Sequence, residues 1–399
     1  MSLVQTTHAP AEEPSFFSVV GPVITVVFVG FLIVGFSMPV LPLHVHDGLG
    51  MSTFAVGLVA GSQFVASLLS RVFAGQFSDS RGPKRAVAIG LIGAAASGGL
   101  YLLSLAFRGT PVVSVGVLLV GRALLGAAES FIITGALGWG FGLARAAHTG
   151  KVIAWVGSAM FAAFAVGAPM GNLLYASFGF FGVALATLLM PLATLAMLTR
   201  TPAVPASQAK KPSASHVLSS ILLPGLGLAA SSLGFGAITA FVSLLYMHNG
   251  WGAGWQAFTA FALALILTRA LFGHLPDKLG GPKVAMVSIL IEGAGQLLLW
   301  MAPSATVALL GAALTGLGYS LVYPAFGTEA VRKAPPESKG LVMGSYTACL
   351  DLTLGVGSPL LGVVGGHAGL PSVFLVSAGA ALIGAAIALA MAVRNASPR

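Results

Sequence analysis

Apolar runs of about 20 residues recur along this 399-residue chain and restrict its fold more than any other feature. Each run is long enough to cross a bilayer as a helix. Backbone polar groups in lipid must be satisfied within the spanning structure, so only helices or a closed barrel qualify. Barrel strands alternate polar and apolar residues, whereas these runs are uninterrupted. With 57% hydrophobic and 7% charged residues, the chain is predicted to be an all-α membrane protein.

The predicted spans fall into two groups of six. The first bundle is expected at 18–200 and the second at 217–393, with a Pro-, Ala- and Lys-rich linker at 201–216 and short tails at 1–17 and 394–399. The twelve spans are placed at Ser18–Val40, Phe54–Phe77, Ala86–Phe107, Val112–Ala136, Val152–Tyr175, Gly179–Leu198, Val217–Tyr246, Trp255–Leu275, Val284–Trp300, Ala305–Phe326, Leu341–Gly362 and Ser372–Val393.

Basic residues occupy alternate loops, which predicts the orientation. Lys and Arg are retained on the cytoplasmic side, so we expect both termini in the cytoplasm of a multi-pass protein of the cytoplasmic (inner) membrane, with only Arg108 outside. The net charge of +9 is spread over separate loops, and this dispersal argues against nucleic-acid binding. The inner residues are Arg81, Lys84, Arg85, Arg145, Lys151, Arg200, Lys210, Lys211, Lys278, Lys283, Arg332, Lys333, Lys339, Arg394 and Arg399.

One charged, glycine-containing stretch occurs twice, at the end of the second span of each half. The copies are SRVFAGQFSDSRGPKRAVAIG at 70–90 and TRALFGHLPDKLGGPKVAM at 268–286. A period of about 200 residues predicts two structurally equivalent halves in parallel orientation. The matching positions are Arg71, Gly75, Asp79, Gly82, Pro83 and Lys84 in the first copy and Arg269, Gly273, Asp277, Gly281, Pro282 and Lys283 in the second.

We expect the repeat to act as a gate. Asp79 and Asp277 lie near a helix C-terminus, where a negative charge is unfavourable to the helix dipole. Each carboxylate is therefore expected to contact another helix N-terminus or an arginine, with Arg71 and Arg269 two turns earlier as candidates. The glycines of the repeat would permit close helix approach. A contact made in one conformation only would be a latch; the alternative is loop anchoring.

The stretch GQFSDSRGPKR resembles the loop signature of the major facilitator superfamily through Gly75, Asp79, Gly82 and Lys84. Two further motifs are similar to that family: LLVGRALLGAAE in the fourth span and VGAPMG in the fifth, the latter related to VGSPLLG in the eleventh. The resemblance implies a secondary transporter without enzymatic activity or cofactor, built from two six-helix bundles that alternate access by rocking. The residues concerned are Arg122 and Gly126, then Gly167, Pro169 and Gly171 as one hinge, and Gly357 and Pro359 as another, with Gly362 ending the motif of the eleventh span.

Ionisable groups inside spans are costly and mark functional candidates. Arg122 and Glu129 are seven residues apart on one helical face, so an acid there could exchange a proton as its distance from the arginine changes. Asp351, in the middle of the eleventh span, is the second proton-carrier candidate. Static structural roles are the alternative for both acids. For Glu292 we favour a structural role, bonded to Gln296 or at an interface.

A central cavity is implied by the resemblance, and few of its polar residues are charged. This suits a modestly polar or amphipathic small molecule. The substrate-binding candidates are Gln63, Trp139, Trp155, Asn172, Tyr319, Tyr323 and Tyr346. His44, His46 and Asp47 cluster after the first span, but we expect a solvated loop there rather than a metal site.

The favoured function is proton-coupled efflux, by antiport, of a drug, sugar or metabolite. A proton-coupled importer (symporter) of a small organic acid is the alternative, with Arg71, Arg122 and Arg269 available to a carboxylate. A membrane-embedded enzyme or sensor is a third possibility, but the sequence has no nucleophile, metal-protease or phosphate-loop motif. The two-bundle design works as a monomer.

Overall fold

The computed structural model describes residues 16–144, 149–199, 201–206, 217–252, 254–332 and 339–396. Within these ranges the chain is helical and contains no strand, which confirms the all-α prediction. Eleven of the described helices are long and apolar enough to cross a membrane. Several predicted features lie outside the described residues: part of each tail, the linker from 207 onward, and the side chains of Arg145, Arg200, Lys210, Lys211, Lys333, Lys339 and Arg399.

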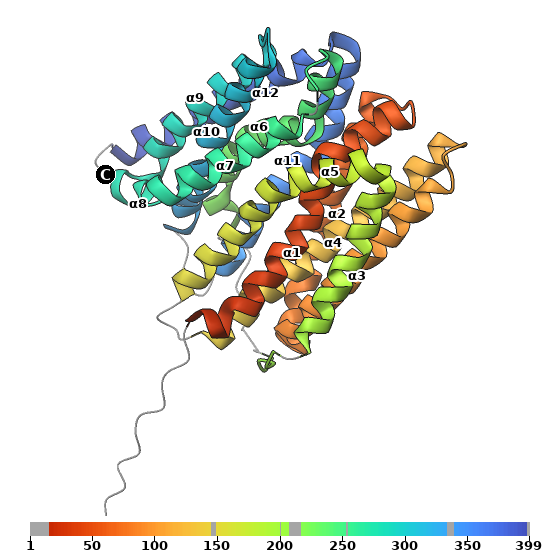
Figure 1. Cartoon of the computed structure of the whole chain (residues 1–399). Coiled ribbons are helices and arrows are strands. Elements are labelled where there is room, and N and C mark those ends of the chain that lie inside the picture. The colour runs from red at the N-terminus through yellow and green to blue at the C-terminus, as the bar shows by residue number, and fades with distance from the viewer. Residues whose placement is uncertain are drawn as a thin grey trace, which may run out of the picture.

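The helices form two groups that lie beside each other (Figure 1). The first group contains α1 (Phe16–Leu43), the short π-helix η1 (His44–Gly48), α2 (Thr53–Arg81), α3 (Pro83–Leu105), α4 (Pro111–Leu143) and α5 (Thr149–Leu198). The second contains α6 (Val217–His248), α7 (Trp255–Phe272), α8 (Leu275–Leu279), α9 (Gly281–Trp300), α10 (Ala305–Arg332), α11 (Lys339–Ala368) and α12 (Pro371–Ala396). These two groups are the first and second bundles.

The fifth and sixth predicted spans are both contained in α5. Gly179 interrupts that helix with a φ of 62° and a ψ of −161°, a conformation that is readily adopted only by glycine. The predicted boundary between the two spans fell at this same glycine. The chain therefore reverses at Gly179, which accounts for eleven long helices where twelve spans were expected.

Glycine and proline fix the turns between helices. Gly82 has a φ of 96° and Pro83 starts α3, and Gly369 has a φ of 85° two residues before Pro371 starts α12. A left-handed residue ends one helix, and proline in the first turn of the next has no hydrogen bond to lose. Ser52 caps α2, its hydroxyl accepting a hydrogen bond from the Ala55 N–H at 3.3 Å.

The two copies of the charged repeat differ in backbone. In the first copy α2 continues through Gly75 to Arg81, whereas in the second α7 ends at Phe272 and α8 follows. Pro276 stands where the first copy has Ser78, and proline removes a helical donor and clashes with the carbonyl of residue 272. The eighth span is therefore shorter than the predicted Trp255–Leu275.

Candidate functional site between the two bundles

One seam between the bundles is formed by α2 and α11, which run antiparallel and approach closely. A Cβ built on Gly57 would lie 2.2 Å from the Ser358 carbonyl oxygen, and one on Gly61 would lie 2.5 Å from that of Gly355. The Thr53 hydroxyl donates to the Gly362 carbonyl at 2.7 Å. These contacts occupy the start of α2, which we call the distal end. The opposite end, where α2 joins α3 at Gly82, is the basic end.

An ion pair continues this seam toward the basic end. Arg71 of α2 contacts Asp351 Oδ2 of α11 through Nη2 at 2.5 Å and Nε at 3.1 Å. The Asp351 side chain is 5% exposed and that of Arg71 is 24% exposed, so the pair lies between the bundles with one edge accessible. Because a buried charge left without its partner is costly, this pair holds α2 against α11.

The expected partners within the charged repeat are therefore wrong for this conformation. Arg71 binds Asp351 rather than Asp79, and Arg269 donates to the Ser320 carbonyl at 2.8 Å rather than to Asp277. Asp79 and Asp277 are both exposed. Each arginine is instead engaged elsewhere, Arg71 with Asp351 of the second bundle and Arg269 with the Ser320 carbonyl and the Phe161 ring.

The glycines of the repeat also differ from expectation. A Cβ on Gly75 would meet nothing within 4 Å, and one on Gly273 would meet only Arg269 of its own turn. Close approach is instead needed at Gly281, where a Cβ would lie 2.2 Å from the Ala325 carbonyl oxygen. Gly280, with a φ of 88°, rather than Gly281 is the structural counterpart of Gly82.

Lys84 anchors the start of the linker to the first bundle. Its ammonium donates to the Thr201 carbonyl at 2.5 Å and lies 6.0 Å from the Trp139 ring centroid. Trp139 Nε1 donates to the Pro202 carbonyl at 2.9 Å. Trp139, predicted to bind substrate, is therefore a buried anchor at the basic end, because its indole N–H needs an acceptor that the linker supplies.

The second seam is formed by α5 and α7. Phe164 of α5 packs edge-on against Phe258 of α7 with ring centroids 6.5 Å apart, and the Thr259 hydroxyl donates to the Ala165 carbonyl at 3.5 Å. The Arg269 guanidinium lies 4.7 Å from the centre of the Phe161 ring. This cation–π contact reaches from the second bundle to the first.

The two seams occupy equivalent positions in the internal repeat. VGAP at 166–169 and VGSP at 356–359 align with an offset of 190 residues, which places Phe161 opposite Asp351. Arg71 and Arg269 are already equivalent in the charged repeat. The partner of each arginine is therefore the same position of the other bundle, once a carboxylate and once a ring. Phe161 was absent from our candidates, although aligning these motifs would have found it.

Glu129 lies in the first bundle, within α4, and is bonded to α2. Gln63 Nε2 donates to Glu129 Oε2 at 2.7 Å, and Ser130 donates to the Ser67 carbonyl at 2.8 Å one turn away. Gly126 allows this approach, since a Cβ there would lie 1.9 Å from the Gln63 carbonyl oxygen. Gln63, predicted to bind substrate, thus holds the predicted proton carrier.

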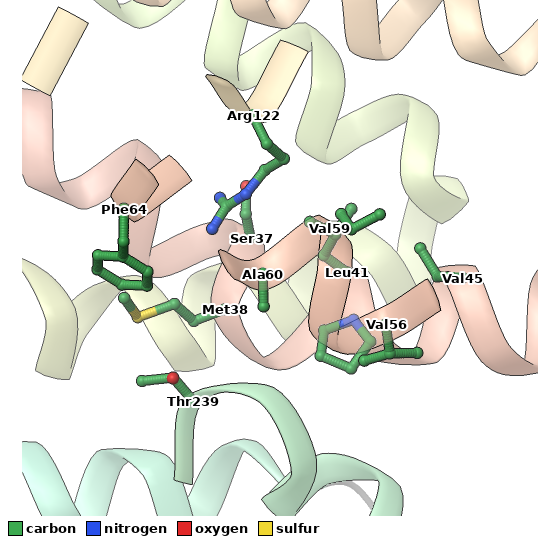
Figure 2. Close-up of a pocket in the computed structure, with 11 residues that line it drawn as sticks. Ser37, Met38, Leu41, Val45, Val56, Val59, Ala60, Phe64, Arg122 and Thr239 are labelled. Atoms are coloured by element: carbon green, nitrogen blue, oxygen red, sulfur yellow. The ribbon is translucent and has the colours of Figure 1, made fainter. Parts of the chain in front are cut away.

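Arg122 makes no ion pair with Glu129, contrary to expectation. The residue is 3% exposed, and its Nε and Nη1 atoms are buried without a hydrogen-bond partner among the described residues. It borders a cavity of about 20 Å³, space for about one water molecule. Figure 2 shows the guanidinium beside Ser37, with Thr239 reaching in from the opposite side. The lining comprises Ser37, Met38, Leu41, Pro42, Val45, Val56, Val59, Ala60, Phe64, Arg122 and Thr239.

Glu292 lies inside the second bundle. Ser231 of α6 donates to Glu292 Oε2, while Gln296 Nε2 donates to the Gly234 carbonyl and to Thr315 Oγ1, both at 3.3 Å. The expected bond between Glu292 and Gln296 is therefore replaced by bonds to neighbouring helices. This network joins α6, α9 and α10, which agrees with the structural role that we favoured.

The tyrosine candidates also pack within the second bundle. Tyr319 stacks on Phe235 with centroids 5.4 Å apart, the Tyr346 hydroxyl donates to the Tyr323 carbonyl at 2.9 Å, and Tyr323 bonds to Thr347 at 2.7 Å. Trp155 is 44% exposed and packs edge-on against Phe17. Asn172 is partly exposed on α5.

The glycine–proline segments run without a break in this conformation. α5 and α11 remain helical at Pro169 and Pro359. Gly171 serves close contact, since a Cβ there would lie 2.3 Å from the Phe36 carbonyl oxygen; Gly167 packs on Gly35 in the same way. Likewise, a Cβ built on Gly357 would lie 2.5 Å from Leu233 Cδ2. Their role as hinges stays a prediction.

The histidines after α1 do not lie in the solvated loop that we expected, because both belong to the π-helix η1 and His44 is buried. His44 stacks on Phe180 with ring centroids 4.0 Å apart, and His46 Nδ1 lies 2.7 Å from the Met51 carbonyl oxygen. Among the described residues no group of three His, Cys, Asp or Glu side chains is placed to hold a metal ion.

The sequence and the fold are both similar to those of known membrane transporters. The sequence profile of the Major Facilitator Superfamily matches residues 23–252 and 224–399. An uncharacterised MFS-type transporter of Pseudomonas aeruginosa (strain UCBPP-PA14) is 41% identical over 392 residues, 98% of each chain. The inward-open xylose transporter XylE from E. coli superimposes with a TM-score of 0.79 at 12% identity, covering 94% of this chain and 96% of that one. A D-xylose–proton symporter gives 0.76 at 13% identity, covering 93% and 97%.

Proposed function

Since this chain belongs to the Major Facilitator Superfamily, we propose that it exchanges protons for a small organic compound across the cytoplasmic membrane, exporting it by antiport. Such a compound would be a drug, sugar or metabolite. The working unit is a single chain, because both bundles and the groups between them come from one polypeptide. The excess of basic residues at the basic end supports cytoplasmic termini.

Alternating access is supported by where the bundles touch. The closest contacts of α2 with α11 run from Thr53 at the distal end to the Arg71–Asp351 pair. With the basic end in the cytoplasm, this is a form closed to the outside. Transport requires α2 and α11 to separate at the distal end, and each contact in the seam opposes that movement.

The observation that carries antiport is the Arg71–Asp351 pair. It joins the two bundles, so it stabilises one conformation of the carrier for as long as Asp351 is charged. An antiporter must keep its empty carrier from reorienting, because a free return would dissipate the proton gradient. A symporter needs that return. A lock that holds until Asp351 takes up a proton therefore favours exchange over symport.

Protonation of Asp351 provides a means of release. A neutral carboxylic acid no longer holds the guanidinium by charge, so the distal seam can open and the proton can be carried between faces. Glu129 is a second group for the same proton path. Its partner Gln63 carries an amide that can donate to the ionised carboxylate or accept from the protonated acid, so Glu129 keeps a hydrogen bond in either state.

The test is transport in proteoliposomes under an imposed pH gradient. Purified wild-type, Glu129→Gln and Asp351→Asn proteins are reconstituted with a pH dye inside, and a solute panel is screened. Substrate added to the compartment on the basic side should drive proton movement in the opposite direction. Co-movement of substrate and proton would establish the symport of an organic acid instead, and unchanged coupling in both variants would remove the proposed proton path.

A further inference from the structure

We propose that Arg122 binds the charged group of a small organic monocarboxylate with an apolar body. This rests on the transporter function proposed above and names its substrate class. Arg122 is 3% exposed as a residue, and its Nε and Nη1 have no hydrogen-bond partner among the described residues. Burying an unpaired charge is expensive, so the site gains free energy when an anion arrives.

No acid of the described bundles satisfies this arginine. Glu129, two turns along α4, is bonded by Gln63, and Asp351 is held by Arg71. Glu292 lies in the second bundle and accepts from Ser231. The buried acids therefore each have a partner of their own. Glu129 is close enough to Arg122 to attract it through space, but no acid among the described residues hydrogen-bonds its Nε or Nη1. We therefore assign the anion that bonds these two atoms to the ligand.

The cavity selects one negative charge on an apolar molecule. Arg122 is the only charged residue of the eleven that line it, and Ser37 and Thr239 supply the only other polar side chains. A guanidinium presents paired N–H donors that match a carboxylate. A phosphate dianion would keep a second charge unpaired among apolar walls such as Leu41 and Val59. The chemistry favours a monocarboxylate.

The position of the cavity fits a transported ligand. α1, α2 and α4 of the first bundle line it, and Thr239 comes from α6 of the second (Figure 2). A bound anion therefore touches both bundles. The present volume of about 20 Å³ holds only a group about the size of a water molecule. Space for the apolar body arises when Met38 and Phe64, which face Thr239, are displaced as the bundles move.

A binding measurement without any proton gradient tests this inference. Purified full-length protein is titrated with benzoate, benzamide and phenyl phosphate, by calorimetry and thermal melting. Benzoate should bind and raise the melting temperature, while neutral benzamide and dianionic phenyl phosphate should not. Arg122→Gln should weaken benzoate binding at least about tenfold. The ligand-free variant should melt no lower than wild type, because an unpaired buried charge is gone. Arg108→Gln, at an exposed turn, is the matched control.

Two further variants keep the test decisive if Arg122→Gln is poorly folded. Arg122→Lys retains the charge without the planar donors and should weaken benzoate several-fold, and Ala60→Leu should block the cavity. Equal binding of benzoate and benzamide, preference for phenyl phosphate, or benzoate affinity unaffected by these variants would overturn the inference. Benzoate binding at Arg122 without proton-coupled flux would instead remove the proposed function and leave this site standing.

Discussion

Each of the two seams between the bundles contains an arginine at an equivalent position, but the two arginines have different partners. In the α2–α11 seam, Arg71 reaches Asp351 at 2.5 Å, whereas in the α5–α7 seam Arg269 lies 4.7 Å over the Phe161 ring. The four positions are equivalent in the duplicated sequence. Both halves carry the cation, but only the position opposite Arg71 holds an acid; the position opposite Arg269 holds a phenyl ring.

This difference separates a seam that protons can switch from one that they cannot. A carboxylate loses its hold on arginine when it is protonated, whereas a phenyl ring attracts a cation at any ordinary pH. In the proposed mechanism, the α2–α11 seam is therefore the place where the proton gradient would act on the conformation. The α5–α7 seam supplies a constant attraction about which the bundles can rock.

The largest expected effect comes from removing the acid of the first seam. Asp351→Asn should reduce gradient-driven transport at least about 100-fold, because the proton carrier is lost. Substrate exchange without a gradient should persist, since the site around Arg122 is intact. Flux in proteoliposomes measures both. Wild-type coupling in Asp351→Asn would show that the ion pair is structural only.

Giving the second seam an acid should slow the carrier. Phe161→Asp places a carboxylate opposite Arg269, so both seams would hold by charge and turnover should fall about tenfold. Phe161→Leu is the control that removes the ring without adding charge. If Phe161→Asp and Phe161→Leu turn over equally, charge at this position does not restrain the bundles.

Replacing glycine by alanine should lower stability where α2 contacts α11, as at Gly57, but not in the charged repeat, as at Gly75. Gly57→Ala puts a Cβ against the Ser358 carbonyl and should destabilise this conformation by about 2 kcal/mol. Gly75→Ala meets open space and should stabilise α2 by about 0.5–1 kcal/mol. Thermal and denaturant unfolding in detergent compares them. Similar losses in both would contradict the packing described here.

The smallest effect is expected from a conservative change in the second seam. Arg269→Lys keeps the charge but loses the stacked guanidinium, so turnover should change less than about threefold. The dependence of the rate on pH should stay that of wild type in the acidic to neutral range, because the substitution leaves the Arg71–Asp351 pair unchanged and adds no acid to the α5–α7 seam. A shifted pH profile would mean that the α5–α7 seam also takes part in coupling.

The fold followed from the sequence because lipid leaves few choices. Span length, uninterrupted apolar runs and the repeat predicted an all-α membrane protein, and even the reversal at Gly179 fell where a span boundary was expected. The break between α7 and α8 was missed, although Pro276 could have indicated it.

The site was only partly predictable. Arg71, Asp351, Glu129 and Arg122 were recognised as costly charges in apolar spans, but their pairing was not. Helical spacing paired Arg71 with Asp79 and Arg122 with Glu129. In the structure Arg71 instead bonds Asp351, which is 280 residues away on another helix. Glu129 bonds Gln63, which is 66 residues away on another helix. Periodicity within one helix carries no information on such distant contacts. For the same reason the sequence did not indicate the contact of Trp139 with the Pro202 carbonyl; substrate binding by the aromatic candidates stays a prediction.

The most direct measurement of the central claim is the distance across the distal end as pH changes. Spin labels on Phe54→Cys of α2 and His367→Cys of α11, in a Cys349→Ala background, would be read by double electron–electron resonance. Wild type should show the short distance at alkaline pH and a growing long-distance population on acidification, and Asp351→Asn should show that population at every pH. A wild-type distribution that does not change with pH would contradict proton control of the α2–α11 seam.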